Sequence, residues 1–433
     1  MRVLVTGAYG LIGAACLARL HAAGHEVVAA GRSLRSARRR FSYAQWIAAD
    51  FGRLGTGAAW EPLLQGVDAV VNCVGVLQDG LRDDVQQVQL EGTKALFDGC
   101  VRAGVKRLVH VSAIGAEADG PSAFSRSKAA AEAYLTKLPL DWVILRPALV
   151  LGSAVYGGTA MLRAIAAFPG IVPIIQADAR LQIIGLDDLA ETVERALAPN
   201  APGRVVWEVA HPQVHSLAEI VTAIRGWLGF APGLLLPLPR AVGKIVAGVA
   251  DALGFLGWRS PARTTALAQL TAGVVGDPAA WMAATGIVPK SLDQILAARP
   301  ASVQDRWFAR LYLLKPLAIA GLSASVMSIG AWELIRSYKW AAAFWGHVPW
   351  SVLAIGVLPE FVAGLLEFAL GLAMLVRRTA RLALVALVAM TLLGIANNAI
   401  AELSRMHYPI TFFAFGIPGL LALLFTLAIL DDR

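Results

Sequence analysis

Hydrophobic positions follow two different patterns along this chain. Up to about residue 300, short apolar runs such as Val3-Leu4-Val5 alternate with stretches of helical periodicity. The strand-like runs end at small or polar residues, namely Thr6, Gly31, Asp50, Asn72, Ser112 and Arg146. This alternation is typical of a doubly wound parallel sheet, in which ligands bind at the carboxyl ends of the strands. We therefore predict an α/β domain of the Rossmann type over residues 1–300.

The remaining residues, 301–433, contain much longer apolar runs. Segments of about 20 apolar residues match the thickness of a bilayer core, and four are predicted here, at about 316–332, 350–376, 382–401 and 409–430. The composition agrees, because 57% hydrophobic and only 16% charged residues are too apolar for a wholly soluble protein. The sequence thus predicts a four-helix, all-α transmembrane bundle with the lipid bilayer as its partner.

Basic residues set the expected orientation of this bundle. They flank the first span and fill the second connection, as Arg306, Arg310, Lys315, Arg377, Arg378 and Arg381. The positive-inside rule assigns both places to the cytoplasm. Met1 precedes the first strand so closely that no cleavable signal is expected. We predict a multi-pass protein of the inner membrane, with the N-terminal domain and the C-terminus in the cytoplasm.

The net charge of +8 raises the question of nucleic acid. Only Arg35 to Arg40 form a dense basic run, which we interpret as a solvated loop. The cysteines lack CxxC spacing and neighbouring histidines. Neither a nucleic-acid partner nor a metal is predicted.

A glycine-rich turn carries the clearest chemistry. It comprises Thr6, Gly7, Tyr9, Gly10, Leu11, Ile12 and Gly13, between the first strand and an alanine-rich helix. A pyrophosphate needs bare backbone N–H groups at a helix N-terminus, and glycine lets the backbone approach it closely. We predict dinucleotide binding here; the alternative is a turn that only packs the helix on the strand.

Other strand ends complete the predicted cofactor site. Arg32, with Ser33, suits the 2′-phosphate of NADP(H), with NAD as the alternative ligand. A carboxylate such as Asp50, followed by Phe51, can accept from the adenine amino group. Small residues after the fourth strand let a nucleotide lie flat, and a proline closes the sixth strand; these residues are Cys73, Val74, Gly75 and Pro147.

Together these motifs resemble an atypical, extended-type short-chain dehydrogenase/reductase, close to the group that includes the nucleotide-binding accessory subunit of respiratory complex I. The resemblance is carried by 6–13, Asp50, 72–75, 89–93, Val111-Ser112, Ser127-Lys128 and Arg146-Pro147. The C-terminal part resembles the DoxX-like membrane family in the number and size of its spans.

The resemblance implies a catalytic tyrosine four residues before Lys128, but Phe124 stands there. It also implies that Lys128 holds the ribose and that Ser112 polarises a carbonyl. Gln89 replaces the family's usual asparagine, so two parts of one proton relay are altered. A phenyl ring cannot exchange a proton. Tyr134, Tyr156 and His110 are possible substitutes, but their spacing favours none of them over a packing role.

Three further segments leave alternatives open. Asp187 and Asp188 are expected to cap a helix rather than form a paired-carboxylate site. Residues 237–258 predict either a helix lying on the bilayer or one packed against the domain. Within the predicted membrane region, Glu360, Glu367, Asn397 and Asn398 indicate either a quinone, proton or small-molecule site or polar contacts between helices.

Two functions therefore compete. The first is a membrane-anchored NADP(H)-dependent oxidoreductase or isomerase with a lipid-like substrate. The second is a non-catalytic module in which a bound dinucleotide is structural or reports redox state to a membrane assembly. Electron transfer to a quinone is disfavoured because we find no flavin or metal motif.

Overall fold

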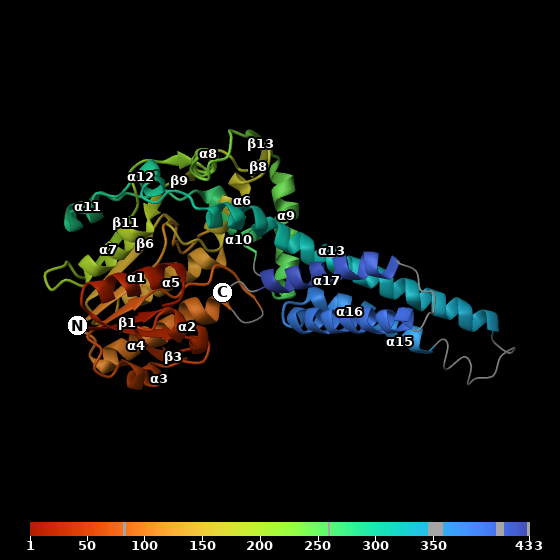
Figure 1. Ribbon diagram of the computed structural model, residues 1–433. Coiled ribbons are helices and arrows are strands. Elements are labelled where there is room, and N and C mark those ends of the chain that lie inside the picture. The colour runs from red at the N-terminus through yellow and green to blue at the C-terminus, as the bar shows by residue number, and fades with distance from the viewer. Residues whose placement is uncertain (81–83, 259, 345–357, 404–410, 431–433) are drawn as a thin grey trace. The chain divides into compact units, whose positions relative to one another are not determined.

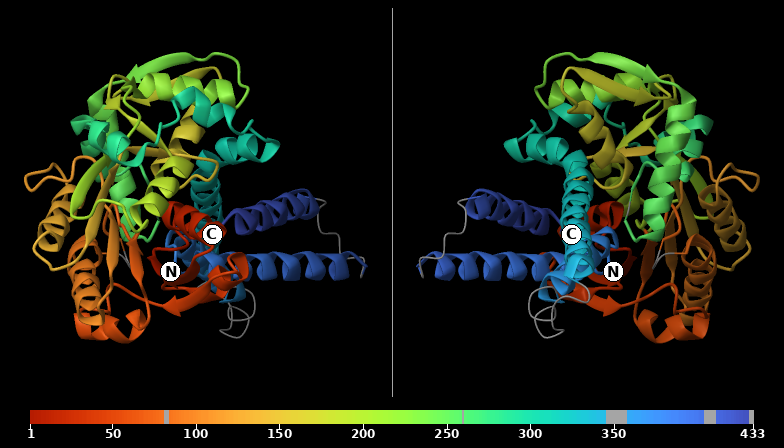
Figure 2. Two further views of the ribbon diagram at one scale, coloured as in Figure 1. Left: turned by 90° about the vertical axis from the view of Figure 1, so that its left-hand side faces the viewer. Right: turned by 90° about the vertical axis from the view of Figure 1, so that its right-hand side faces the viewer.

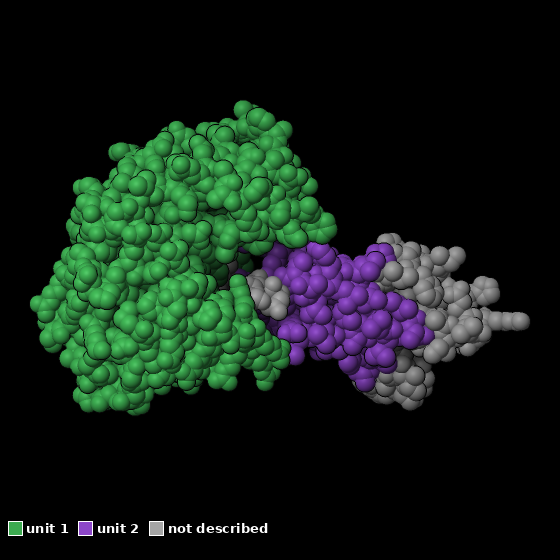
Figure 3. Space-filling model, turned by 60° about the vertical axis from the view of Figure 1, so that its left-hand side comes forward, with its two compact units in different colours: residues 1–255, 259–310 green, residues 256–258, 311–433 purple. Residues whose placement is uncertain are grey.

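The computed structural model describes residues 1–80, 84–258, 260–344, 358–403 and 411–430. The chain divides into two compact units (Figure 3). The first comprises Met1–Phe255 and Arg259–Arg310, and the second comprises Leu256–Trp258 and Leu311–Arg433.

A seven-stranded parallel sheet forms the centre of the first unit (Figure 1). Its order is β11-β6-β5-β4-β1-β2-β3. The strands are β1 (Arg2–Thr6), β2 (Glu26–Gly31), β3 (Gln45–Ala48), β4 (Ala69–Asn72), β5 (Arg107–Val111), β6 (Trp142–Pro147) and β11 (Val205–Val209). The predicted doubly wound parallel sheet is confirmed. Its strand order reverses between β1 and β4, which is where such sheets bind ligands.

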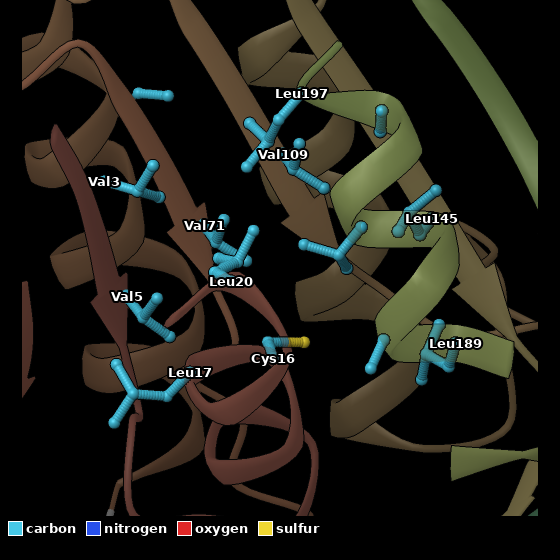
Figure 4. Close-up of a cluster of buried hydrophobic side chains, with 14 of the residues drawn as sticks. Val3, Val5, Cys16, Leu17, Leu20, Val71, Val109, Leu145, Leu189 and Leu197 are labelled. Carbon is cyan, nitrogen blue, oxygen red and sulfur yellow. The ribbon is translucent and has the colours of Figure 1, made fainter. Parts of the chain in front are cut away.

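Helices lie on both faces of the sheet (Figure 2), and alternating side chains of the strands build two hydrophobic layers against them. Val3 and Val5 point to one face, against helices α1 (Leu11–Ala22) and α7 (Leu186–Ala196) (Figure 4). Leu4 points to the other face, which α3 (Gly57–Trp60), α4 (Gly92–Ala103) and α5 (Ala123–Leu135) cover. A sheet buried on both faces leaves the strand ends as the place for chemistry.

Two local expectations were wrong. The basic run forms helix α2 (Leu34–Arg40) instead of a loop, because Leu34 and Ala37 pack against the core on one side of it. Helix α7 begins after Gly185, so neither Asp187 nor Asp188 is its N-cap. The buried carboxylate of Asp188 instead accepts from the backbone N–H of Lys290 at 2.9 Å and pairs with its Nζ at 3.0 Å.

The rest of the first unit consists of three two-stranded sheets and short helices. The sheets pair β7 (Leu149–Leu151) with β10 (Ile183–Gly185), β8 (Ile171–Ile175) with β13 (Leu234–Leu238), and β9 (Arg180–Leu181) with β12 (His215–Ser216). The helices are η1 (Glu61–Leu64), η2 (Gln86–Glu91), α6 (Gly158–Ala166), α8 (Leu217–Trp227), α9 (Arg240–Phe255), α10 (Thr264–Ala272), α11 (Ala279–Thr285) and α12 (Leu292–Ala297). A buried ion pair, Arg163 to Asp305 at 2.8 Å, fastens α6 to the first turn of α13 (Val303–Phe344).

The second unit contains most of α13 together with α15 (Leu358–Leu375), α16 (Ala380–Leu403) and α17 (Thr411–Ile429). Two segments, Val303–Lys339 and Leu358–Leu375, are long and apolar enough to cross a membrane. The apolar stretches Ala380–Ala396 and Pro418–Ile429 are shorter. The predicted spans 350–376, 382–401 and 409–430 can be compared only in part, because some of their residues lie outside the described ones. The four-span bundle therefore stays a prediction.

Small residues let α13 and α15 approach closely. A Cβ on Gly330 would lie 2.6 Å from the carbonyl oxygen of Gly364, and the Ser323 hydroxyl donates to the Gly371 carbonyl at 2.6 Å. Close crossing at small residues is common between membrane helices. Glu360 forms an ion pair with Arg336 at 3.1 Å, which favours a polar contact between helices for this residue.

The predicted roles of the other polar residues of the second unit stay predictions. Glu367 is half-buried near Gly330. Asn397 and Asn398 belong to α16, but their side chains lie outside the described residues.

Candidate dinucleotide site

The glycine turn joins the end of β1 to α1. Gly7 adopts a φ of 63°, and a Cβ there would lie 2.9 Å from the carbonyl oxygen of Cys73. The N–H of Gly10 donates to the Gly7 carbonyl at 2.9 Å, and a Cβ on Gly13 would collide with the same carbonyl. Only glycine combines this backbone conformation with these close approaches. The turn is thus pressed against the end of β4, at the switch point of the sheet.

The N-terminus of α1 is open for a ligand. Its N-cap residue is Gly10, and its first turn, which includes Leu11 and Ile12, contains no acidic side chain. Within the described part of the chain, no side-chain cap therefore competes for the first N–H groups of the helix. Free N–H groups and the positive end of the helix dipole fit a pyrophosphate.

Thr6 connects the ends of β1 and β4 through its side chain. Its buried hydroxyl donates to Oδ1 of Asn72 at 2.7 Å, and the same oxygen accepts from the N–H of Val74 at 3.2 Å. The Asn72 amide nitrogen contacts Nδ1 of His110 at 3.1 Å. Burial holds the pKa of His110 well below its usual range. His110 is therefore a neutral interior group, and this contact does not direct it toward a substrate.

Tyr9 covers the end of β2. A Cβ on Gly31 would lie 2.9 Å from Cδ1 of the Tyr9 ring, and the Tyr9 hydroxyl accepts from the backbone N–H of Arg32 at 3.3 Å. The ring also stacks on Trp46, with centroids 6.2 Å apart. Ser33 follows at the N-cap of α2. The structure thus brings Tyr9 of the glycine turn next to Arg32 and Ser33, the two residues that the sequence assigns to the 2′-phosphate.

After β3 the chain carries a half-buried residue, Asp50, and a buried one, Phe51. The Asp50 carboxylate accepts from the N–H of Gly52 at 3.1 Å and lies 3.8 Å from Arg53. Phe51 is buried and packs edge-on against Trp60, with ring centroids 5.0 Å apart. Asp50 therefore has a carboxylate within reach of solvent, whereas the Phe51 ring belongs to the core.

Gly75 marks the place where β4 and α5 converge. A Cβ at Gly75 would lie 3.7 Å from Nζ of Lys128 and 3.6 Å from Oε1 of Gln89. Gln89, in the π-helical turn η2, accepts from the N–H of Val76 at 2.9 Å and donates to the Ser127 hydroxyl at 2.9 Å. The longer amide thus connects the β4 loop to α5 directly.

Lys128 is 3% exposed, and its ammonium group donates to the Val111 carbonyl at 2.8 Å. Burial lowers the pKa of Lys128 to about 8, although the nearby Glu132 carboxylate opposes the shift. Ser112 follows Val111 and is also buried; among the described residues its hydroxyl has no hydrogen-bond partner. Phe124 lies one turn earlier on α5 and is half-buried. The lysine and the serine converge as expected, but α5 carries no hydroxyl at the tyrosine position.

The proposed substitutes do not restore that hydroxyl. Tyr134 donates to the Asp98 carboxylate at 2.7 Å, which raises the pKa of Tyr134 to about 12. Tyr156 is 60% exposed and lies before α6. Pro147 ends β6, where its carbonyl accepts from the N–H of Ile114 at 3.2 Å. The hydrogen bond of Tyr134 thus directs its hydroxyl to Asp98 of α4.

The sequence did not reveal what packs beside this site. Gln269 of α10 donates to Ser122 at 2.7 Å and to Ser125 at 2.5 Å, both at the N-terminus of α5. Arg263 donates to the Asp79 carbonyl at 2.5 Å, on the loop after β4. These partners are 144 to 184 residues apart along the chain. No local pattern contains a signal for contacts of this separation.

Comparisons with known proteins agree with this geometry. Residues 7–162 match the family model described as NAD(P)H-binding. An uncharacterised protein of Mycobacterium tuberculosis strain H37Rv is 30% identical over 197 residues, which are 46% of this chain and 20% of that protein. The photosystem II assembly factor Ycf39 of Synechocystis is 30% identical over 147 residues, 34% of this chain and 44% of that protein. The matches thus span less than half the length of either relative.

Solved structures match over a larger part of the chain. WbmG of Bordetella bronchiseptica in complex with NAD has a TM-score of 0.51 at 21% identity, covering 68% of this chain and 91% of that one. MoeE5 in complex with UDP-glucose and NAD has a TM-score of 0.53 at 19% identity, covering 72% and 100%. Together with the family model, these likenesses show that the first unit has an NAD(P)-binding fold of the Rossmann type.

Proposed function

We propose that this chain is a membrane-anchored oxidoreductase or isomerase that uses NADP(H) and acts on a lipid-like substrate. One observation carries the proposal. The turn at Gly7 presses against β4 at the switch point, and the β4 tip in turn meets Lys128 at Gly75. The glycine turn after β1 and Lys128 of α5 both lie close to the tip of β4, which supports a single dinucleotide site.

The residues present fit the cofactor. The N–H groups at the start of α1 hold the pyrophosphate, and Arg32 with Ser33 receives the 2′-phosphate. Asp50 accepts from the adenine amino group, while Lys128 binds the nicotinamide ribose. When bound, the cofactor supplies or accepts a hydride.

The chain's own part in the chemistry is to orient the substrate and to manage a proton. The Ser112 hydroxyl, which has no partner among the described residues, donates to a substrate carbonyl oxygen. Lys128 has a pKa of about 8 because of its burial, so its ammonium group exchanges protons close to neutral pH. Without a tyrosine at position 124, water or this ammonium group must provide the proton.

Membrane anchoring is supported by the second unit. Its helices α13 and α15 contain the two membrane-compatible segments. Lys315 of α13 and Arg377 of the connection between α15 and α16 both donate to the Leu430 carbonyl, at 3.4 and 3.1 Å, so two basic residues gather at one end of the unit. By the positive-inside rule this end faces the cytoplasm. We propose that residues 301–433 form a DoxX-like bundle in the inner membrane and that residues 1–300 lie on its cytoplasmic side.

A second function is favoured by Phe124. A dinucleotide-binding module without catalysis needs the phosphate site but no tyrosine. The Synechocystis relative is named as a photosystem II assembly factor. In this alternative, the bound nucleotide stabilises the first unit, and the partner is a membrane protein assembly.

Turnover distinguishes the two functions. The full-length protein is purified in detergent, and the nucleotide that it retains is identified by mass spectrometry. NADPH deuterated at C4 is then incubated with the protein and membrane lipid extract. Transfer of deuterium into a lipid supports the enzyme. Retained nucleotide with neither deuterium transfer nor isomerisation of a lipid, in the wild type and in Phe124→Tyr, supports the non-catalytic module.

A further inference from the structure

Helix α9 carries an unusual exposed stripe. Ile245, Val246, Val249, Leu253 and Phe255 are 68%, 43%, 57%, 36% and 79% exposed. The buried positions of the same helix are small, at Gly243, Ala247, Ala250 and Gly254. At 100° per residue, Ile245, Val246, Val249 and Leu253 fall within about 100° of one another and form one stripe, on a different side from the buried set, while Phe255 ends the helix outside this stripe. The helix thus packs on the first unit through small residues and turns its large apolar side chains outward.

Strands close to α9 also expose apolar side chains. Gly243 packs on β8, because a Cβ there would lie 2.8 Å from Cγ2 of Ile175. The paired strands β8 and β13 expose Ile171, Leu234 and Leu236, by 51%, 68% and 45%. Exposed apolar side chains that gather on one element, as on α9, are typical of a binding site for a protein or a membrane.

We infer that α9 lies in the plane of the membrane surface, with its apolar stripe inserted among the lipids. The helix combines an apolar face with exposed basic residues, Arg240 and Lys244, near its N-terminus. Basic side chains beside an apolar stripe complement the anionic headgroups of a bilayer. Arg240 lies at the N-terminus, where its charge opposes the helix dipole, so a helix-stabilising role does not explain it.

The residues that follow α9 indicate that lipid is what covers its apolar stripe. The residues directly after Phe255, Leu256–Trp258, belong to the second unit. The Leu256 carbonyl accepts from the N–H of Arg377 at 2.9 Å, and the Trp258 indole donates to the Leu375 carbonyl at 2.6 Å. Leu375 is the last residue of α15, one of the two membrane-compatible helices.

These contacts hold the residues directly after α9 at the end of α15. The Arg377 guanidinium lies 5.6 Å from the centre of the Trp258 ring. Tryptophan and arginine at the end of a span are typical of the headgroup region. Only the peptide bond to Leu256 separates Phe255 from these residues, so the C-terminus of α9 is covalently tied to this anchor.

This placement links the membrane surface to the nucleotide site. Asp251 of α9 accepts from Arg263 at 2.6 Å, and Arg263 donates to the Asp79 carbonyl on the loop after β4. An in-plane α9 therefore holds the β4 loop near the bilayer, where a lipid-like substrate arrives. The inference rests on the proposed membrane anchoring.

Photo-crosslinking in nanodiscs that contain phosphatidylglycerol tests the inference on the full-length protein. The photoreactive residue p-benzoylphenylalanine replaces Val249, or Ile245 as a second stripe position. The matched control is Val288, which is 82% exposed in the first unit but outside the stripe. Leu366 of α15, 46% exposed, reports on the anchor itself.

We expect lipid adducts at Val249, Ile245 and Leu366, with yields at least about fivefold above that at Val288. Adducts at Leu366 without adducts at either stripe position would overturn the inference and leave the anchor intact. Adducts of the stripe with protein instead of lipid would also overturn it. If Leu366 gives no lipid adduct either, the membrane anchoring fails as well.

Discussion

The phosphate side and the catalytic side of the nucleotide site depend on different parts of the chain, the first on backbone and the second on side chains. The phosphate side depends on backbone, through Gly7 and Gly13, and every close approach it needs is present. The catalytic side depends on side chains, and there Phe124 lacks the hydroxyl that should accompany Lys128 and Ser112. Binding and turnover therefore rest on separable parts of the fold, and substitutions should affect them independently.

The largest effect is expected from Gly7→Ala. The added methyl group would be held at positive φ and 2.9 Å from the Cys73 carbonyl, so the turn must move away from the pyrophosphate. We expect NADPH affinity, measured by calorimetry, to fall roughly a thousandfold. Gly24→Ala is the matched control, because Gly24 has a φ of 83° but nothing within 4 Å of its Cβ position. Equal losses of NADPH affinity in both variants would show that backbone strain is responsible, and not the close contact between the glycine turn and Cys73.

The second effect concerns the pH dependence of stability. The pKa of Lys128 is about 8 in the folded protein and 10.5 in a free lysine, so the unfolded chain binds more protons between these pH values. The free energy of unfolding should therefore rise with pH across this window, by up to about 3 kcal/mol. Thermal unfolding between pH 7 and 10.5 measures it.

Two variants isolate the contribution of Lys128. The rise should be absent from Lys128→Met but retained in Lys137→Met, which alters an exposed lysine. If the free energy of unfolding rose with pH by the same amount in the wild type and both variants, this would contradict a buried Lys128 with a lowered pKa.

Phe124→Tyr tests the catalytic side directly. A hydroxyl one turn before Lys128 restores a proton donor, and we expect turnover of NADPH to rise about thirtyfold, below the full value of an optimised acid–base group. NADPH affinity should stay unchanged because the phosphate side is untouched. Phe41→Tyr, at another half-buried phenylalanine of the first unit, should leave turnover unaltered. Tight binding with no turnover in either variant would favour the non-catalytic module.

The smallest effect is expected from Arg32→Asp. Replacing the cation with a carboxylate removes attraction for a 2′-phosphate and adds an acceptor for a 2′-hydroxyl. The ratio of NADPH to NADH affinity should fall about tenfold. An unchanged ratio would refute the assignment of Arg32 to the 2′-phosphate.

Local cues made the centre of the fold predictable. The turn from Thr6 to Gly13 lies within one loop, and the strands that follow show their burial as continuous apolar runs. The same cues placed Ser112, Phe124 and Lys128, because strand ends and helix spacing fix their positions.

Distant partners could not be predicted in the same way. The residues around Asp188 do not indicate that Lys290 will bind its carboxylate. Those around Ser122 likewise do not indicate its hydrogen bond with Gln269. The pairing of β8 with β13 likewise depends on tertiary packing. The sequence identified Tyr9 only as one residue of the glycine turn. In the structure its ring covers Gly31, because the tips of β1 and β2 are adjacent in the sheet.

The central claim is that the first unit binds a nicotinamide dinucleotide at the β1 to α1 turn. Titration of NADPH and of NADH into the detergent-solubilised, full-length protein tests it most directly. The account predicts saturable binding of one equivalent per chain, tighter for NADPH, and its loss in Gly7→Ala but not in Gly24→Ala. Absence of saturable binding of both nucleotides would contradict the account.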